Sequence, residues 1–456
     1  MVERARHGVA PAYLLLCLLL GGSAQGIWAN MILQLVGIAI LAWAAVTPSA
    51  EPLAKDHRQL LGLVTLGLAL VVLQLVPLPP DIWERLGGRG PVAEGYRVLG
   101  IAAPWLPISL TPHESLATLL SAVPALALLA AILRLGGRPL WLALALIAGM
   151  IAGVILGALQ VSSAVPEQSP WYLYSRTNFG AATGFFANAN HMAMLLVSTL
   201  PFLAAMLASA RGEKVNVQRF SAALAVTAGI ALIVAVGIIL NGSLAGFGLL
   251  LPVLIASGAL LVRKRSPAVK GLVLGGTGLL LAAAAVLVLS PLAGKNLQAG
   301  AATSIQSRAE MREVTAQAAA DFMPLGSGLG SFRRVYALYE DHERLDPRTV
   351  VNHAHNDYFE LALELGLPGM LLLALFLAWW GRTAWRAWTE ADPDAYARAA
   401  SIASAAILAH SLVDYPLRTA AISGCFAMCL AVMAMRPRPA PGDSSSLWPT
   451  RHVVVD

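Results

Sequence analysis

The stretch HAHNDYFELALELGLPGMLLLALFLAWW, residues 353–380, passes directly from a polar cluster into a long apolar run. The polar part, residues 353–360, holds two imidazoles, an amide and two carboxylates. An apolar run of about 20 residues can cross a bilayer as a helix. At such a boundary a lipid-borne substrate would present its head group, and imidazole is the side chain best suited to move a proton near neutral pH. The stretch therefore predicts a membrane protein with chemistry at one end of a spanning helix.

The composition supports this prediction along the whole chain. Hydrophobic residues make up 57% and charged residues 12%, which excludes an ordinary soluble domain. The apolar stretches predict an all-α polytopic membrane protein with about 12 transmembrane helices. The expected spans are residues 9–22, 30–48, 60–79, 115–133, 139–160, 190–209, 221–240, 243–262, 271–291, 359–380, 396–415 and 417–435.

The basic residues predict the orientation, because Lys and Arg accumulate in short cytoplasmic loops. With the N-terminus inside, the short inner loops carry most of these residues, and the polar cluster faces the outside. The net charge of +6 is therefore interpreted as a topological signal, and nucleic-acid binding is not expected. Residues 1–25 also resemble a signal peptide, but a retained first helix is favoured. The basic residues assigned to the inside include Arg4, Arg6, Arg134, Arg138, Arg211, Lys214, Arg219, Arg263, Lys264, Arg265, Lys270, Arg382, Arg386 and Arg398.

Four parts of the chain are expected. Residues 1–291 form the first nine helices with outer segments near 80–114 and 161–189, residues 292–358 form a long outer loop between helices nine and ten, and residues 359–435 form the last three helices. Residues 436–456, rich in Pro and Ser, are expected to be a disordered cytoplasmic tail. Within the loop we expect a helix over 304–320, a break at Pro324, Gly326, Gly328 and Gly330, and a second basic segment over 331–339, together acting as a lid.

The spacing around the polar cluster resembles a family signature. His355-Asn356, then residues 357–365, then Gly366 and Gly369 fit the His-Asn, nine residues, Gly, two residues, Gly pattern of the O-antigen ligase and Wzy polymerase family. The resemblance extends over roughly residues 170–425. It implies a GT-C-like, inverting and metal-independent glycosyltransferase without a cofactor, in the bacterial inner membrane, whose periplasmic loop carries the active site.

The resemblance assigns the proton acceptor to His355, the His of the His-Asn motif. The alternative is a helix-capping or interfacial His. His353 is interpreted as a supporting residue, because no third metal ligand is obvious beside the His-x-His spacing. Asn356 and Asp357 are expected to orient the His or to cap the next helix, and capping is favoured for Asp357. Glu360, on the first turn of a span, is expected to contact the sugar acceptor.

The leaving diphosphate needs positive charge, which Arg supplies through a fork that matches phosphate oxygens. Arg308 resembles the Arg that family members carry at the start of the loop helix and is assigned to the diphosphate; a solvated helix face is the alternative. Family members also carry an Arg at the outer start of the eighth span, where this chain has Leu244. Either Arg176, Arg312 or Arg418 replaces the missing charge, or the donor is held differently.

Two further polar clusters resemble family sequence. Asn188 and Asn190, with His191, open a span and are expected to donate and accept hydrogen bonds at the membrane edge or to cap the helix. His410 and Asp414 lie four residues apart on the expected eleventh span, followed by Arg418. They are interpreted as a structural pair or as part of the acceptor site, with structure favoured.

The expected donor is a glycan on undecaprenyl diphosphate. The acceptor is lipid A core in a ligase or another lipid-linked glycan in a Wzy-type polymerase, which corresponds to lipopolysaccharide O-antigen, capsule or exopolysaccharide biosynthesis. A protein O-oligosaccharyltransferase is an alternative. From another class, a polysaccharide or lipid transporter or flippase is an alternative, although the middles of the spans carry almost no charge.

Overall fold

The computed structural model describes residues 2–23, 27–48, 53–210, 217–262, 291–340, 351–390 and 394–435. Within these ranges the chain is helical apart from loops and one pair of two-residue strands. The expected span 271–291 and the tail 436–456 lie outside the described residues, as does the loop segment 341–350.

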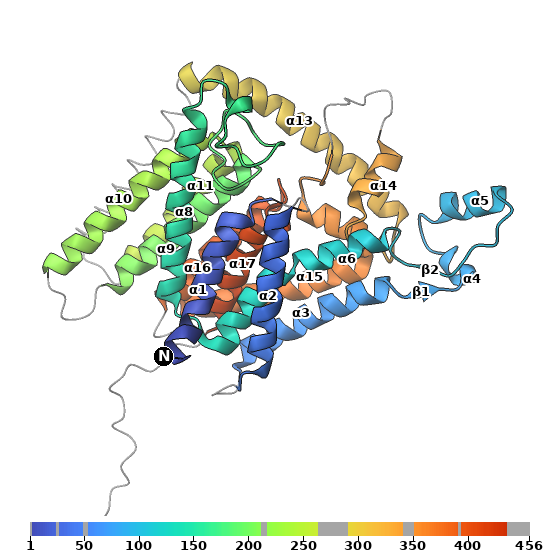
Figure 1. Ribbon diagram of the computed structural model, residues 1–456, viewed down its shortest axis with the longest axis horizontal. Helices are drawn as coiled ribbons and strands as arrows, with labels where there is room; N and C mark the ends of the chain where they lie inside the picture. The colour runs from blue at the N-terminus through green and yellow to red at the C-terminus, as the bar shows by residue number, and fades with distance from the viewer. Residues whose placement is uncertain are drawn as a thin grey trace, which may run out of the picture.

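The first half of the chain forms helices joined by two irregular segments (Figure 1). Its elements are α1 (Val2–Leu20), α2 (Trp28–Val46), α3 (Lys55–Gln74), β1 (Pro77–Leu78), α4 (Pro80–Trp83), α5 (Gly90–Val98), β2 (Leu106–Pro107), α6 (Pro112–Ser121), α7 (Val123–Ala130), a π-helical turn (Ala131–Gly136), α8 (Pro139–Val161), a 3-10 turn (Pro166–Gln168), α9 (Ala189–Ser209), α10 (Val217–Asn241) and α11 (Leu244–Val262).

The second half brings the loop helices and the last helices of the bundle. Its elements are α13 (Pro291–Asp321), α14 (Phe332–Tyr339), α15 (Asp357–Thr389), α16 (Ala395–His410), a 3-10 turn (Pro416–Arg418) and α17 (Ala420–Ala434).

The described residues include eight helices long and apolar enough to cross a membrane. Two shorter apolar helices, Arg6–Leu20 and Ala420–Ala434, pack among them. The prediction of an all-α polytopic membrane protein is therefore confirmed, whereas the number twelve remains a prediction. The eight are Trp28–Val46, Lys55–Gln74, Pro112–Gly136, Pro139–Val161, Ala189–Ser209, Ser221–Asn241, Leu244–Leu261 and Asp357–Thr389.

The core of the bundle is built around α9, which packs against α8, α10, α11 and α16 and is buried on nearly all sides. Helices α16 and α17 pack against each other through small residues such as Ala403 and Ala431, which let helix backbones approach closely. In contrast, α2 and α3 keep exposed apolar residues such as Leu35 and Leu73, as expected of faces turned to lipid. The free cysteines Cys17, Cys425 and Cys429 are buried in this core, as packing side chains would be.

Helix α13 crosses one end of the bundle and packs against α15 and α14 (Figure 1). The loop helix expected over 304–320 is confirmed, but it begins earlier, at Pro291. Behind it Phe322, Phe332, Val335 and Leu363 form a second apolar cluster, separate from the main core. The described segment 311–339 is therefore packed against the start of α15.

The glycines of the signature make room for this unit on α15. Gly366 has φ +59°, and a Cβ there would lie 2.2 Å from the carbonyl oxygen of Pro324. The Leu367 amide donates to that oxygen at 2.8 Å, and the Ser327 amide donates to Leu363 O at 2.9 Å. Glycine is required because other residues resist positive φ. Residues 357–365 are therefore the helical segment between His355-Asn356 and the kink at Gly366.

One expected span is irregular and another ends early. The expected span 115–133 lies within the candidate span Pro112–Gly136, which consists of α6, α7 and a π-helical turn, with Pro124 at the start of α7. The span 396–415 ends at His410, so placing Asp414 on that helix was wrong. Pro416 explains why a helix could not continue to residue 415, because proline disfavours the helical conformation of the residue before it, and Tyr415 has φ −124° and ψ 55°.

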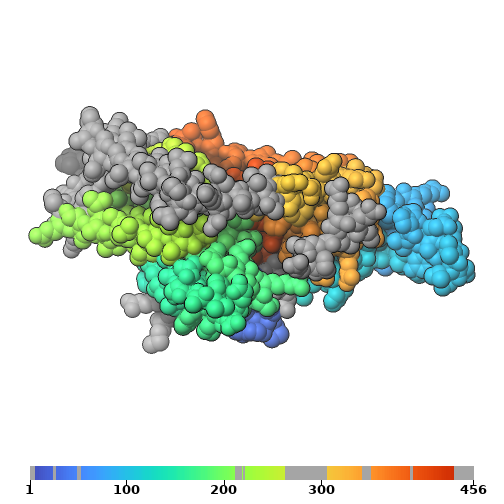
Figure 2. Space-filling model, turned by 90° about the horizontal axis from the view of Figure 1, so that it is seen from above, coloured from blue at the N-terminus to red at the C-terminus, as the bar shows by residue number. Residues whose placement is uncertain are grey.

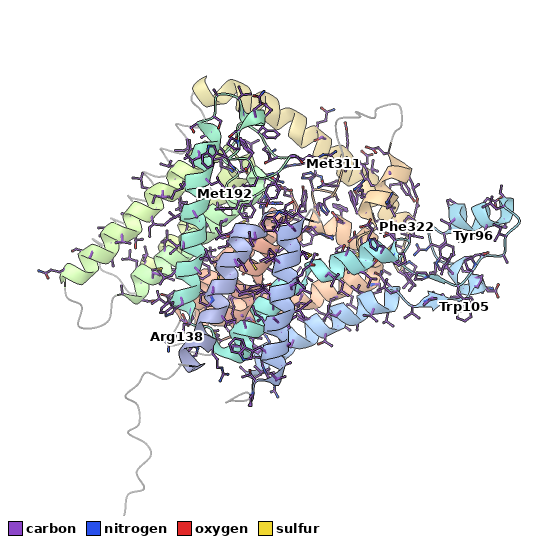
Figure 3. All side chains as sticks on the ribbon, in the orientation of Figure 1. Tyr96, Trp105, Arg138, Met192, Met311 and Phe322 are labelled. Carbon is purple, nitrogen blue, oxygen red and sulfur yellow. The ribbon has the colours of Figure 1, made fainter. Side chains whose placement is uncertain are left out.

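Basic residues gather at the other end of the bundle from the start of α15. Arg6 donates to the carbonyl oxygen of Arg134 at 3.3 Å, and Arg134 donates to that of Thr47 at 2.9 Å. At the far end of α15, Arg386 pairs with Asp56 at 2.6 Å. Figure 3 places Arg138 beside the N-terminal end of α1. The spatial separation matches the predicted inner and outer ends, although the orientation in the membrane remains a prediction.

Candidate active site

The polar cluster is folded back over the first turn of α15. His355 has φ +48°, and the amide of Ala354 donates to Glu360 Oε2 at 3.0 Å. Asn356 is the N-cap: its Oδ1 accepts from the amides of Tyr358 and Phe359. Positive φ is uncommon outside glycine, so these contacts hold His355 in a conformation that it would rarely adopt alone.

This segment is fixed to the loop between α16 and α17. Asn356 Nδ2 donates to Leu412 O at 2.8 Å, and the Asp357 amide donates to Ser411 O at 2.9 Å. The Ser411 hydroxyl in turn donates to Asp357 Oδ2 at 2.8 Å. Two segments more than fifty residues apart in the chain therefore form one rigid surface.

Asp414 is the centre of the site. His355 Nδ1 lies 3.0 Å from its Oδ1, and Asn190 Nδ2 donates to its Oδ2 at 2.5 Å. Asn188 Nδ2 lies 3.5 Å from the same oxygen, at the limit of a hydrogen bond, while Asn188 also caps α9. The structure thus joins the three clusters that the sequence treats separately.

The Asp414 side chain is 0% exposed and carries a stable negative charge. Burial alone would raise its pKa, but the hydrogen bond from His355 and the nearby imidazoles, including His191 and His410, lower the pKa below its ordinary value. His410 Nε2 lies 3.9 Å away. His355 is 22% exposed, so a buried anion orients an imidazole that solvent and substrate can reach.

Tyr415 is the aromatic wall of the site. Its ring centroid lies 4.3 Å from that of His353, 4.9 Å from that of His355 and 5.2 Å from that of His191. Burial raises the pKa of Tyr415 to about 12, so the phenol is neutral. The ring limits the rotation of the two imidazoles that begin the signature.

A second cluster surrounds Arg418. Its Nη2 lies 3.2 Å from Glu360 Oε1 and 3.2 Å from Glu364 Oε2, and its Nε lies 3.6 Å from Asp357 Oδ1. Burial lowers the pKa of Arg418, but the three carboxylates more than reverse this effect, so the net shift is upward. His353 Nδ1 lies 2.8 Å from Glu360 Oε1.

Two expectations need correction, and a third stays a prediction. Glu360 is 1% exposed and both of its oxygens have protein partners, and its expected contact with an acceptor stays a prediction. The capping residue of α15 is Asn356, whereas Asp357 is the first helical residue and faces Ser411 and Arg418. His191 supplies no hydrogen bond from its ring: it is buried, and neither ring nitrogen has a partner among the described residues.

The arginines assigned to the diphosphate lie outside these clusters. Arg308 and Arg312 are half-buried on α13, Arg176 is exposed between α8 and α9, and none of the ion pairs among the described residues includes them. Arg308 is close enough to His410 to act on it electrostatically. Leu244 begins α11 directly after Ser243, whose hydroxyl donates to Asn190 Oδ1 at 2.7 Å, so the substituted position borders the Asp414 site.

Sequence reasoning missed Tyr415, Ser243 and the role of Glu364. The signal for Tyr415 is its place between Asp414 and Pro416: the proline ends the helix and turns both side chains into the site. In the described part of the chain, no group of three or more His, Cys, Asp or Glu side chains has a geometry that could hold a metal ion.

Residues 229–374 match the family model described as O-antigen ligase (Wzy_C). The match includes Arg308, His355, Asn356 and both signature glycines, and it ends before Asp414. The comparison with curated proteins gives no match. The family assignment predicted from the signature is confirmed by this domain, and with the apolar helices it makes the chain a multi-pass membrane protein.

Proposed function

We propose that this protein, which carries an O-antigen ligase family domain, transfers a glycan from undecaprenyl diphosphate to a sugar hydroxyl at the periplasmic face of the inner membrane. His355 takes the proton of the acceptor hydroxyl, the hydroxyl oxygen attacks the anomeric carbon, and the bond from that carbon to the diphosphate breaks. The diphosphate leaves on its polyprenyl chain. An attack of this kind inverts the anomeric centre.

The contact between His355 and Asp414 is the observation that carries the proposal. When Nδ1–H donates to a buried carboxylate, Nε2 is the nitrogen that accepts a proton. Asp414 also stabilises the imidazolium that forms when the acceptor is deprotonated. No described side chain occupies Nε2 with a hydrogen bond, and His355 is partly exposed. The pair therefore has the arrangement of a general base with an orienting carboxylate.

The leaving diphosphate requires cations that protein carboxylates do not already neutralise. Arg308 meets this requirement because none of the ion pairs among the described residues includes it. Arg418 does not meet it, because three carboxylates surround it. Arg308 also lies near enough to His410, which borders Asp414, to interact with it. We therefore assign the diphosphate to Arg308, with Arg176 and Arg312 as supporting cations, and no metal ion is needed to neutralise it.

The surface beside the site suits a lipid-linked donor. Leu412 and Val413 directly precede Asp414 and are exposed, and Leu244 is exposed beside Ser243. Apolar side chains next to a buried ionised group are expected where a polyprenyl chain brings its head group to the chemistry. We propose that Asn188 and Asn190, which fix Asp414, together with Asn356, which fixes the loop, act as positioning residues.

A product assay tests the proposal. The purified full chain in lipid nanodiscs receives an undecaprenyl-diphosphate glycan and, in separate reactions, lipid A core, a second lipid-linked glycan or a protein acceptor. We expect a new glycosidic bond of inverted configuration and release of undecaprenyl diphosphate, with equal rates in EDTA. The productive acceptor distinguishes ligase, polymerase and protein O-glycosylation. Movement of the intact donor across a bilayer without bond formation would instead support a flippase and overturn the proposal.

A further inference from the structure

A small module extends sideways from the bundle between α3 and α6. It comprises residues 77–107, with β1, α4, α5 and β2, and it forms one end of the molecule in both Figure 1 and Figure 2. The strands pair Pro77 with Pro107 and Leu78 with Leu106. The module therefore has a defined structure of its own, and it lies beside the bundle instead of over the active site.

The base of the module is fixed firmly to the bundle. Trp83 Nε1 donates to Pro107 O at 2.8 Å, which closes the module. Buried Arg89 donates to Gly326 O at 3.0 Å and lies between the rings of Trp83 and Phe322. The Leu110 amide donates to Ser327 O at 2.9 Å. The direction in which the module projects is therefore set by contacts and not by a loose hinge.

The far edge of the module exposes large apolar side chains although no span-length helix lies there. Val98 is 77% exposed, Trp105 is 65% exposed and Ile101 is 57% exposed, and Figure 3 shows Trp105 on this projecting part. Ile82, Val92 and Leu99 are exposed as well. Elsewhere in the described residues, long exposed apolar faces belong mainly to helices that can cross a membrane. A cluster of this size on a soluble face marks an interaction surface.

Helix α5 separates its side chains by direction. At about 100° per residue, Val92 and the C-cap residue Leu99 lie close together on one side of the helix, and Val98 lies at the edge of the same apolar arc, beside Glu94. Arg97 lies on the opposite side and forms an ion pair of 2.7 Å with Glu94, with both side chains more than half exposed. Ala93 is buried against the module. The apolar arc is therefore turned away from Arg97.

The positions of the two ends of the module indicate what covers its apolar side. It begins three residues after α3 and ends five residues before α6, and both α3 and the segment Pro112–Gly136 are candidate membrane spans. A segment that joins the same ends of two spans and extends sideways must lie along the membrane surface. Exposed Trp and branched apolar residues are typical of proteins at the boundary between head groups and acyl chains.

We propose that the edge formed by Val92, Val98, Leu99, Ile101 and Trp105 inserts into this boundary in the leaflet on the active-site side. The module carries Asp81, Glu84 and Glu94 against Arg85, Arg89 and Arg97, so its formal charge is zero. Apolar contact, and not attraction to anionic lipids, therefore drives the insertion. This in-plane anchor would fix the height of α6 and of the turn over 324–330, which rests on α15.

Fluorescence quenching on the full chain tests the proposal. Val98→Cys and Ile101→Cys carry an environment-sensitive dye in phosphatidylcholine nanodiscs, and Arg97→Cys is the matched control because Arg97 is 66% exposed and lies about 100° from Val98 around α5. The native cysteines are buried, and background labelling is measured on the unchanged chain. We expect lipids with a quencher near the head of the acyl chain to quench positions 98 and 101 several-fold more than position 97, and aqueous iodide to do the reverse.

The outcome should not change with salt or when phosphatidylglycerol replaces part of the phosphatidylcholine. Equal iodide quenching at all three positions would overturn the proposal. Protection from iodide without quenching by lipid, lost when the protein is diluted to one copy per nanodisc, would overturn it in favour of contact with a second copy. Val98→Asp with Ile101→Asp should expose a dye on Trp105→Cys to iodide while the protein still folds, which thermal unfolding in the same nanodiscs monitors.

Discussion

Asp414 and Arg418 lie four residues apart in one loop, yet their surroundings are opposite. Asp414 is a buried anion that accepts from His355 and Asn190 and has further imidazoles nearby. Arg418 is a cation, 17% exposed, that faces three carboxylates on the first turns of α15. The cluster around Asp414 therefore contains a partly exposed imidazole, that of His355. In the cluster around Arg418, the positive charge is already paired with carboxylates and is not available to a substrate.

This difference assigns a catalytic role to the cluster around Asp414 and a structural role to the cluster around Arg418. Removing a partner from a buried ion pair leaves an uncompensated charge, which destabilises a protein by about 3–5 kcal/mol. Around Arg418 the expected consequence is loss of the docking between α15 and the loop after α16. Around Asp414 the expected consequence is misorientation of His355. Activity and stability measured together on the same variants therefore distinguish the two clusters.

The largest effect on turnover is expected for His355→Ala. A positioned general base contributes about 10²–10⁴-fold, so turnover should fall by a factor in that range while thermal unfolding and donor binding stay unchanged. His113→Ala, at an exposed His near the start of α6, is the control. A fully active His355→Ala enzyme would show that His355 is not the general base and would make His353 the next candidate.

The same assay gives the pH dependence. A protonated base cannot accept the acceptor's proton, so acid should reduce turnover. Asp414 has a lowered pKa, so the stability that its charge contributes is present above the ordinary carboxyl range and is lost only as pH falls through that lowered value. As pH is lowered, loss of turnover should therefore precede any loss of folded protein in a parallel unfolding measurement.

The next largest effect is expected for Asp414→Asn. The amide keeps the size of the side chain but removes the charge that fixes the imidazole and its tautomer, so part of the general-base contribution of about 10²–10⁴-fold should be lost. Turnover should fall with little change in the KM for the donor. Asp321→Asn, which alters a carboxylate bonded to Tyr339 at 2.9 Å, is the control. An unfolded Asp414→Asn protein with a stable His355→Ala protein would show that Asp414 belongs to the scaffold.

Part of the fold around this site follows from the sequence, and the reason is local. The signature predicts that a span follows the polar cluster, and residues Asp357–Thr389 form that helix, but it favours Asp357 instead of Asn356 as the cap and does not predict the kink at Gly366. The lengths of the apolar runs predict the helices for the same reason, because they also depend only on neighbouring residues. What the signature does not contain is the three-dimensional meeting of His355, Asp414 and Asn190, because those residues come from helices whose order in space is set by packing in the core.

The errors have a physical cause as well. The sequence predicts Asp414 on the helix of His410, but that helix ends at His410, and Asp414 lies in the loop that follows, where it contacts both His410 and His355. The sequence favours Asp357 as the cap of α15, but the side chain of Asn356 caps it. The contact between Asp414 and His355 joins distant parts of the chain, and hydropathy and spacing carry no information about such a contact.

A smaller effect, mainly on the KM for the donor, is expected for Arg308→Ala. Hydrogen bonds to charged groups contribute about 1.5–3 kcal/mol, so the KM should rise by roughly 10–100-fold, and inorganic diphosphate should inhibit the variant less well. Arg308→Lys should recover only part of the loss because it lacks the planar fork. Arg333→Ala, at an exposed position on α14, is the control. An unchanged KM for Arg308→Ala, with a raised one for Arg176→Ala or Arg312→Ala, would move the diphosphate to those residues.

The smallest effect on turnover is expected for Arg418→Lys. The lysine keeps the positive charge among Asp357, Glu360 and Glu364 but cannot reach all three at once, so the unfolding temperature should drop. Because Arg418 is assigned no contact with substrate, the activation free energy should change by less than about 1.4 kcal/mol, which is under tenfold in turnover. Arg386→Lys, paired with Asp56 and Glu390 at the opposite end of the bundle, is the matched control and should behave alike. A large loss of turnover in Arg418→Lys alone, without loss of stability, would show that Arg418 as well as Asp414 takes part in catalysis.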